Sequence, residues 1–176
     1  MENLCKILVI EDNPEHLKDV KRSLNERKSF MSASYTSNLE DALKMLNTEK
    51  YDGILSDAHF PKTENGAEEL SGIDMMDYAI HHKLPITFVT SIYHYDRKTD
   101  RKTQRLRNKI LLHGTAISLV YNLIGKYKNW DEGIHKLLEF IDKAKNGEIK
   151  YSVVPKTESP VEGVTPEHTR IDFIYK

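Results

Sequence analysis

Residues 51–61, YDGILSDAHFP, form the stretch on which the predicted fold depends. An apolar pair, Ile54 and Leu55, leads directly through Ser56 into Asp57. A short apolar run without alternation is typical of a buried parallel strand. A carboxylate at the carboxyl end of such a strand faces the crevice in which open α/β sheets bind ligands.

Residues 6–14, KILVIEDNP, repeat this pattern near the N-terminus. The apolar residues at positions 7–10 run straight into Glu11 and Asp12. Because parallel strands end at the same edge of a sheet, we expect Glu11, Asp12 and Asp57 to converge there. The predicted function depends on this convergence.

The rest of the chain alternates between strand and helix patterns. Alternation of this kind indicates a parallel sheet with helices on both faces, so the predicted fold class is a doubly wound, five-stranded α/β fold. We expect strands at residues 5–10, 30–36, 51–57, 84–91 and 115–121. We expect helices at residues 14–28, 39–46, 73–82, 95–111 and 131–145.

Three local features complete this prediction. Residues 62–71, KTENGAEELS, are polar and read as a surface loop lengthened by an insertion. Asp131 is the expected N-cap of the last helix. The inward face of the third helix is predicted to consist of Ile73, Met76, Ala79 and Ile80.

Net charge, cysteine count and the lengths of the apolar runs exclude several classes of protein. A net charge of -1 over 176 residues argues against general nucleic-acid binding. The single cysteine, Cys5, excludes an intrachain disulfide and fits a reducing cytosol. We see neither a membrane-length apolar run nor a signal peptide, and therefore expect a cytoplasmic protein.

Residues 95–111 are strongly basic, with seven lysines and arginines against two aspartates. This helix is either a solvated face or a docking surface for an acidic partner. Aromatic residues that could stack on bases are not interleaved with the charges, which argues against nucleic acid as that partner.

Three carboxylates crowded at one sheet edge repel one another unless a cation lies between them. Oxygen ligands favour a hard ion, and a few carboxylates with water suit Mg²⁺. No cysteine pair or closely spaced histidines accompany the three acids, which argues against zinc. A carboxylate beside Mg²⁺ can attack a phosphoryl group, and the hydroxyl of Thr90 or Ser91 at the neighbouring strand end could bind a phosphoryl oxygen.

At this point the sequence resembles the receiver domains of bacterial two-component response regulators. The matching stretches are KILVIEDN at 6–13, DGILSDAHFP at 52–61 and LPITFVTS at 84–91. Their order and spacing fit over residues 4–144, and the resemblance implies a flavodoxin-like fold. Residues 1–147 would be the receiver domain, and residues 148–176 a C-terminal extension or tail.

The resemblance also implies a mechanism. Asp57 would be the phosphoacceptor, and Glu11 and Asp12 would hold Mg²⁺ together with Asp57 and the backbone carbonyl of His59. Thr90 would be the switch hydroxyl, whose movement repacks an aromatic position on the fifth strand.

The same resemblance implies a signalling protein that is not an enzyme beyond self-dephosphorylation. It would receive its phosphoryl group from a histidine kinase or a phosphotransfer protein. Output would come through protein contact at the basic fourth helix and fifth strand, either with another protein or with a second copy in a homodimer.

Two departures from the family pattern leave alternatives open. The family carries a lysine at the end of the fifth strand, a place that falls here at Tyr121 or Asn122. Lys109 lies before that strand, and Lys126 and Lys128 lie a little beyond it. The long loop after residue 61 is the second departure.

A missing lysine would support a pseudo-receiver, a binding module that works without phosphorylation. A Mg²⁺-dependent phosphatase is a third reading. It is disfavoured because His59, rather than an acid, stands two residues after Asp57.

Overall fold

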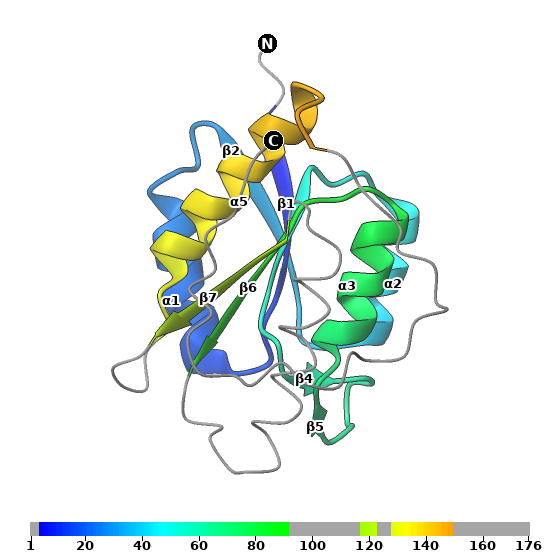
Figure 1. The fold of residues 1–176 in the computed structure, drawn as a ribbon. Helices are drawn as coiled ribbons and strands as arrows, with labels where there is room; N and C mark the ends of the chain where they lie inside the picture. The colour runs from blue at the N-terminus through cyan, green and yellow to red at the C-terminus, as the bar shows by residue number, and fades with distance from the viewer. Residues whose placement is uncertain (1–3, 92–116, 123–127, 150–176) are drawn as a thin grey trace, which may run out of the picture.

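The computed structural model describes residues 4–91, 117–122 and 128–149. Its main sheet contains five parallel strands in the order β2-β1-β3-β6-β7, seen nearly edge-on in Figure 1. The strand bounds are β1 Cys5–Ile10, β2 Met31–Thr36, β3 Gly53–Ser56, β6 Ile86–Ser91 and β7 Ile117–Asn122. The predicted doubly wound sheet is therefore confirmed.

The strand order reverses between β1 and β3, so these two neighbours flank the switch point of the sheet. In their register, Ile10 lies opposite Ser56. The residues that follow, Glu11 and Asp57, consequently leave the sheet side by side. The topology thus accounts for the convergence of two acids that are far apart in sequence.

Helices cover both faces of the sheet, with α1 and α5 on one side and α2 and α3 on the other (Figure 1). The helices span Pro14–Asn25 (α1), Leu39–Thr48 (α2), Gly72–His81 (α3) and Trp130–Lys145 (α5). Two apolar cores result, because alternate residues of the central strands point to opposite faces. On β1, for example, Ile7 and Val9 pack under α1 and α5, whereas Leu8 and Ile10 pack under α2 and α3.

The helix starts follow capping chemistry, with one correction. Asn13 caps α1 as its side chain accepts the Glu15 N–H at 2.9 Å. The prediction that Asp131 caps the last helix is wrong, because the cap is Asn129, whose side chain accepts the Glu132 N–H at 3.2 Å. Asp131 lies instead in the first turn, where a negative charge is stabilised by the helix dipole.

The predicted inward face of the third helix needs a similar correction. Met75, Met76, Ala79 and Ile80 are buried in α3, whereas Ile73 is only partly buried. The helix begins at Gly72, tight against Ala58, and this start sets the rotation that turns Met75 inward.

The polar segment after β3 is more ordered than a plain surface loop. Phe60–Pro61 (β4) and Glu68–Glu69 (β5) pair as a short antiparallel ladder. Its base is closed by the Ser71 hydroxyl, which donates to the carbonyl of Phe60 at 2.8 Å. The segment between Phe60 and Ser71 therefore begins and ends at neighbouring points of the fold.

Three sequence expectations lie wholly or partly outside the described residues: the basic helix at 95–111, the first residues of the strand at 115–121, and most of the tail at 148–176. Within the described part, no helix combines the length and the apolar character needed to cross a bilayer.

Candidate functional site

The three predicted acids meet at the carboxyl edge of the sheet. Carboxylate oxygens of Glu11, Asp12 and Asp57 all lie within 4.8 Å of one another. Glu11 and Asp57 are buried, at 1% and 4% exposure, and Asp12 is half-buried. The expectation that these acids converge is confirmed, and we call this group the acidic cup.

Backbone hydrogen bonds fix Asp57 in the cup. Its N–H donates to the carbonyl of Ile10 at 2.9 Å, which extends the β1–β3 pairing by one step. Its Oδ1 accepts the N–H of Ala58 at 2.6 Å, so the carboxylate is held in one orientation. The second oxygen, Oδ2, is left to face the other charged groups of the cup.

Glu11 is fixed on the opposite wall. Its N–H donates to the carbonyl of Thr36 at 3.0 Å. Its Oε1 accepts the N–H of Asn13 at 3.0 Å and lies 3.6 Å from Nδ1 of His16. One oxygen is thus engaged by the start of α1, and Oε2 points toward Asp57.

Lys128 supplies the ammonium that the family pattern places at the end of the fifth strand. Its side chain is buried, and Nζ lies 2.5 Å from both Glu11 Oε2 and Asp57 Oδ2. A lysine is therefore present in the cup, although not at Tyr121 or Asn122, where the family pattern places it. The lysine stands six positions beyond the end of β7 at Asn122, just before α5, and still reaches the cup.

The charge of Lys128 is secured by its neighbours. Burial by itself lowers the pKa of the ammonium, but the carboxylates of Asp57 and Glu11 raise it overall. Nζ also lies 5.5 Å from the centroid of the Trp130 ring, within the range of a cation–π contact. Since Trp130 is the only tryptophan, its fluorescence reports on this ammonium.

Asp12 is the member of the cup whose pKa is raised. Burial raises its pKa to about 6, and the negative charges of Glu11 and Asp57 add to the effect. Glu68, on β5 of the insertion, contributes in the same direction. Sequence reasoning missed Glu68, since nothing in a polar loop indicates that its fold brings one of its acids near the cup.

Of the two remaining predicted residues, His59 is close to Asp57 in the chain, and Thr90 is near the level of Asp57 on the neighbouring strand. His59 is buried at 6% exposure, and its carbonyl belongs to the turn that follows Asp57. Thr90 is buried at 3% exposure near the end of β6. Since Ser56 pairs with Phe88, Thr90 stands one residue beyond the level of Asp57 on the neighbouring strand.

The donor set of the cup fits Mg²⁺. Three carboxylates within 4.8 Å offer only oxygen ligands, in the small number that Mg²⁺ accepts alongside water. Burial, followed by the negative charges of Glu11 and Asp57, raises the pKa of Asp12, and a bound cation would offset both effects. Glu11, Asp12, Asp57 and the backbone carbonyl of His59 are the groups that would hold the ion.

We expect the affinity for Mg²⁺ to fall in acid. Asp12 must lose its proton to bind the ion, and its pKa is about 6 without metal. The affinity should therefore be constant well above pH 6 and fall by about tenfold per pH unit below it. Titration followed by Trp130 fluorescence at pH 7.5 and pH 5 measures the difference.

Asp12→Asn is the control for this titration. The amide carries no proton to lose, so the variant should bind Mg²⁺ more weakly at pH 7.5 and show a flatter pH dependence. Equal affinity of the unmodified protein at both pH values would contradict the assignment of Asp12.

Fold and site together define a flavodoxin-like α/β protein with an acidic pocket at its switch point. The family model of the response regulator receiver domain matches residues 7–105, more than half of the chain. The chain belongs to the response regulator receiver domain family. None of the curated protein sequences matches it significantly.

Solved structures agree on the fold. The signal receiver domain of an HD domain-containing protein from Pseudomonas fluorescens Pf-5 is 14% identical with a TM-score of 0.58, covering 82% of this chain and 99% of that one. A response regulator receiver domain protein from Clostridium thermocellum is 19% identical with a TM-score of 0.54, over 81% and 98% of the two chains. A response regulator receiver protein from Sinorhizobium medicae WSM419 is 15% identical with a TM-score of 0.54, over 81% and 98%.

Proposed function

We propose that this receiver domain is a phosphorylatable switch in which Asp57 accepts a phosphoryl group from a histidine kinase or a phosphotransfer protein. The observation that carries the proposal is the buried contact of Lys128 with both Asp57 and Glu11, in a cup that already holds three carboxylates. A lysine and three acids at one sheet edge are the groups that an acyl phosphate needs around it.

In the transfer step, Oδ2 of Asp57 attacks the phosphorus of a phosphohistidine. A P–O bond forms as the P–N bond breaks, and the leaving imidazole keeps the electron pair. Oδ1 stays bound to the N–H of Ala58, which keeps the attacking oxygen pointed into the cup. Bound Mg²⁺ would neutralise charge on the phosphoryl oxygens.

Lys128 and Thr90 act on the product. The ammonium of Lys128 already touches Asp57, so it can pair with a phosphoryl oxygen by a small movement. The hydroxyl of Thr90 is the donor from the neighbouring strand. Its shift would alter β7, whose Tyr121 lies beside Thr90 in the ladder.

The proposal also covers the domain bounds, the cellular location and the output surface of the protein. Residues 1–147 form the receiver domain, in agreement with the end of α5 at Lys145, and residues 148–176 form an extension. The protein works in the cytoplasm and signals by contact with a protein partner or a second copy. The basic residues 95–111 and β7 are the proposed output surface. The only enzymatic activity that we propose for the protein is self-dephosphorylation.

Intact-mass analysis after incubation with acetyl phosphate and Mg²⁺ tests the proposal. We expect the unmodified protein to gain the mass of one phosphoryl group and Asp57→Asn to gain none. Asp19→Asn is the matched control, because Asp19 is a carboxylate on the outer part of α1, paired with Arg22. It should be modified like the unmodified protein.

The pseudo-receiver is the competing function. Its main support was the absence of a lysine, which the position of Lys128 removes. If neither acetyl phosphate nor beryllofluoride with Mg²⁺ distinguishes Asp57→Asn from the unmodified protein, the phosphorylation proposal fails and the pseudo-receiver replaces it.

A further inference from the structure

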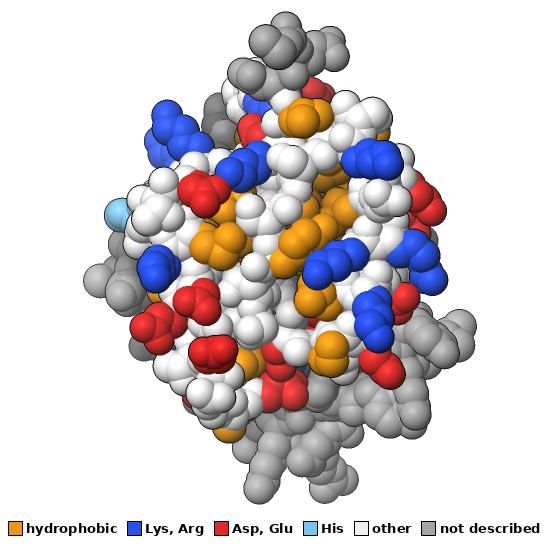
Figure 2. Space-filling model, turned by 180° about the vertical axis from the view of Figure 1, so that it is seen from behind, with side chains coloured by type: hydrophobic (Ala, Val, Ile, Leu, Met, Phe, Trp, Pro, Cys, Tyr) orange, Lys and Arg blue, Asp and Glu red, His pale blue; other side chains and the backbone are white. Residues whose placement is uncertain are grey.

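Strand β2 forms one edge of the five-stranded sheet and pairs only with β1 among the described strands. Its residues are half-buried or exposed after Met31. Figure 2 shows this side of the molecule, where hydrophobic side chains run down the middle of the face and basic side chains lie beside them. A parallel edge strand with a free row of N–H and C=O groups is a template for another strand.

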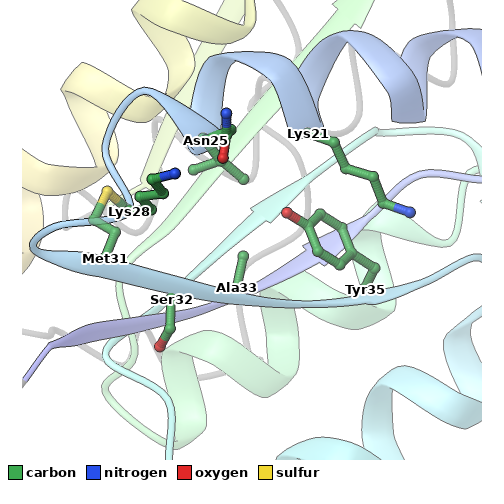
Figure 3. A pocket seen from close by; sticks show the side chains of 8 residues that line it. Lys21, Asn25, Lys28, Met31, Ser32, Ala33 and Tyr35 are labelled. Carbon is green, nitrogen blue, oxygen red and sulfur yellow. The ribbon is translucent and has the colours of Figure 1, made fainter.

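A groove of about 290 Å³ lies between this edge and the second half of α1. Leu24 of α1 together with Met31, Ala33 and Tyr35 of β2 form its apolar wall. In Figure 3 the side chain of Ser32 points away from the helix, as the alternation of a strand requires. The groove therefore follows the strand for at least two side-chain positions on the α1 face.

A lysine stands at each end of the groove. Lys21 lies beside Tyr35, with Nζ 4.8 Å from the centroid of the ring, and Lys28 lies near Met31 (Figure 3). Both lysines are exposed, and the lining contains no acidic residue. The charge complement of this groove is consequently negative.

The apolar surface continues beyond the end marked by Lys28. Phe30 and Leu4 are each 49% exposed, and they are the exposed large hydrophobic residues of the described part. The two segments are neighbours, because the N–H of Cys5 donates to the carbonyl of Phe30 at 2.9 Å. A ligand that extends past this end of the groove thus meets two further exposed apolar side chains.

We propose that the groove between α1 and β2 binds an extended acidic segment of a partner protein, which adds to the sheet as a strand beside β2. Main-chain hydrogen bonds to the edge provide affinity, and alternate side chains enter the groove. Acidic side chains pair with Lys21 and Lys28, and an apolar side chain between them covers Leu24 and Ala33.

The spacing of the lysines fits this mode. Lys21 is on α1 and lies beside Tyr35, whereas Lys28 is in the turn that follows the helix and lies near Met31 (Figure 3). Two side chains on one face of a strand, four residues apart, are about 13 Å apart. Met31 and Tyr35, the residues beside the two lysines, are themselves four residues apart on β2, so the predicted motif of the added strand is acid, any, apolar, any, acid.

A second copy of this chain is a poorer occupant. Pairing of two β2 edges would bring the same lysines of both copies to one seam, and like charges there repel. The acidic cup is also not part of the groove, because none of the three acids of the cup is among the residues that line the groove. The proposal therefore stands apart from phosphorylation.

The test uses a fluorescein-labelled peptide, Thr-Glu-Thr-Val-Thr-Glu-Thr, with blocked ends, and the full chain at low ionic strength. We expect saturable binding by fluorescence anisotropy and backbone NMR shifts centred on β2. The peptide with both glutamates changed to lysine, and the peptide with alternate amides N-methylated, should each bind at least tenfold more weakly. The first loses charge pairing and the second loses strand pairing.

The double variant Lys21→Glu/Lys28→Glu should weaken binding of the glutamate peptide by tenfold or more. Arg22→Glu/Lys44→Glu makes the same change in net charge at exposed positions outside the groove, and should leave binding within about twofold. Asp57→Asn should not affect it. Absence of binding, equal binding of all peptides, NMR shifts away from β2, or a β2-mediated dimer that excludes the peptide would overturn the proposal.

Discussion

Replacing Lys128 by methionine should lower the free energy of unfolding by about 3 kcal/mol at neutral pH in the absence of divalent ions. Methionine keeps most of the side-chain volume and removes only the ammonium. Glu11 and Asp57 would then face each other, buried and without their shared cation. Breaking a buried ion pair costs more than the pair contributes, because an uncompensated charge stays behind.

The deficit should depend on pH and on Mg²⁺. Without the ammonium, the two buried carboxylates repel each other whenever both are ionised. Protonation of either carboxylate in acid relieves this repulsion, so the loss of stability is smaller in acid than at neutral pH. The variant should therefore come closest to the unmodified protein in acid, and saturating Mg²⁺ at neutral pH should restore most of the difference.

Urea unfolding of both proteins at pH 4.5 and pH 7.5, with and without Mg²⁺, measures these effects. Lys143→Met is the control, because Lys143 makes an ion pair of the same 2.5 Å length with Glu139 on the surface of α5. Surface pairs contribute about 0 to 1 kcal/mol, so this variant should change little. If the loss of unfolding free energy in Lys128→Met did not depend on pH or on Mg²⁺, the lysine would act only through packing.

Gly133→Ala should destabilise the protein by about 2 kcal/mol, although alanine favours helices. A Cβ at Gly133 would lie 2.3 Å from Cγ2 of Val89 and 3.3 Å from Cδ1 of Leu55. Val89 is buried in β6 and β-branched, so its side chain has few rotamers into which it can retreat. Helix α5 would have to move away from the sheet. Because Lys128 lies two residues before α5, this movement would also shift its contacts with Glu11 and Asp57.

A double-mutant cycle identifies the cause. Val89→Ala opens a cavity and is destabilising alone, but in combination with Gly133→Ala it removes the clash, so the two changes should cost less together than in sum. Gly53→Ala is the comparison variant, since its Cβ would meet Cδ1 of Leu137 and Cδ1 of Ile141 at 2.9 Å and Cγ1 of Ile141 at 3.1 Å, and would not contact Val89. Additive effects at 133 and 89 would contradict the steric explanation.

Sequence reasoning located the strands and the cup because buried parallel strands have a simple signature. An apolar run that ends in acid, twice, implies one shared edge once the sheet is known to be parallel. Hence Glu11, Asp12 and Asp57 could be predicted together. Thr90 could be placed for the same reason, at the end of a third such run.

Lys128 could be named only as one of three lysines near the expected place, because its approach to the cup depends on tertiary geometry. Counting along the strand gives only residues that follow β7 directly, whereas this lysine enters the cup from the start of α5. Glu68 escaped notice for a related reason. Its approach to Asp12 depends on the fold of a polar insertion, for which hydrophobic periodicity has no signal.

The closed base of the β4–β5 ribbon makes its tip a convenient place for labels. The N–H of Gly72 donates to the carbonyl of Ala58 at 3.1 Å, so the chain re-enters α3 beside the point where it left. Residues 62–67 between the two short strands are all exposed. Extra length at an exposed tip adds little to the entropy of closing a loop. An epitope or dye attachment sequence inserted there would leave the chemistry of the cup undisturbed.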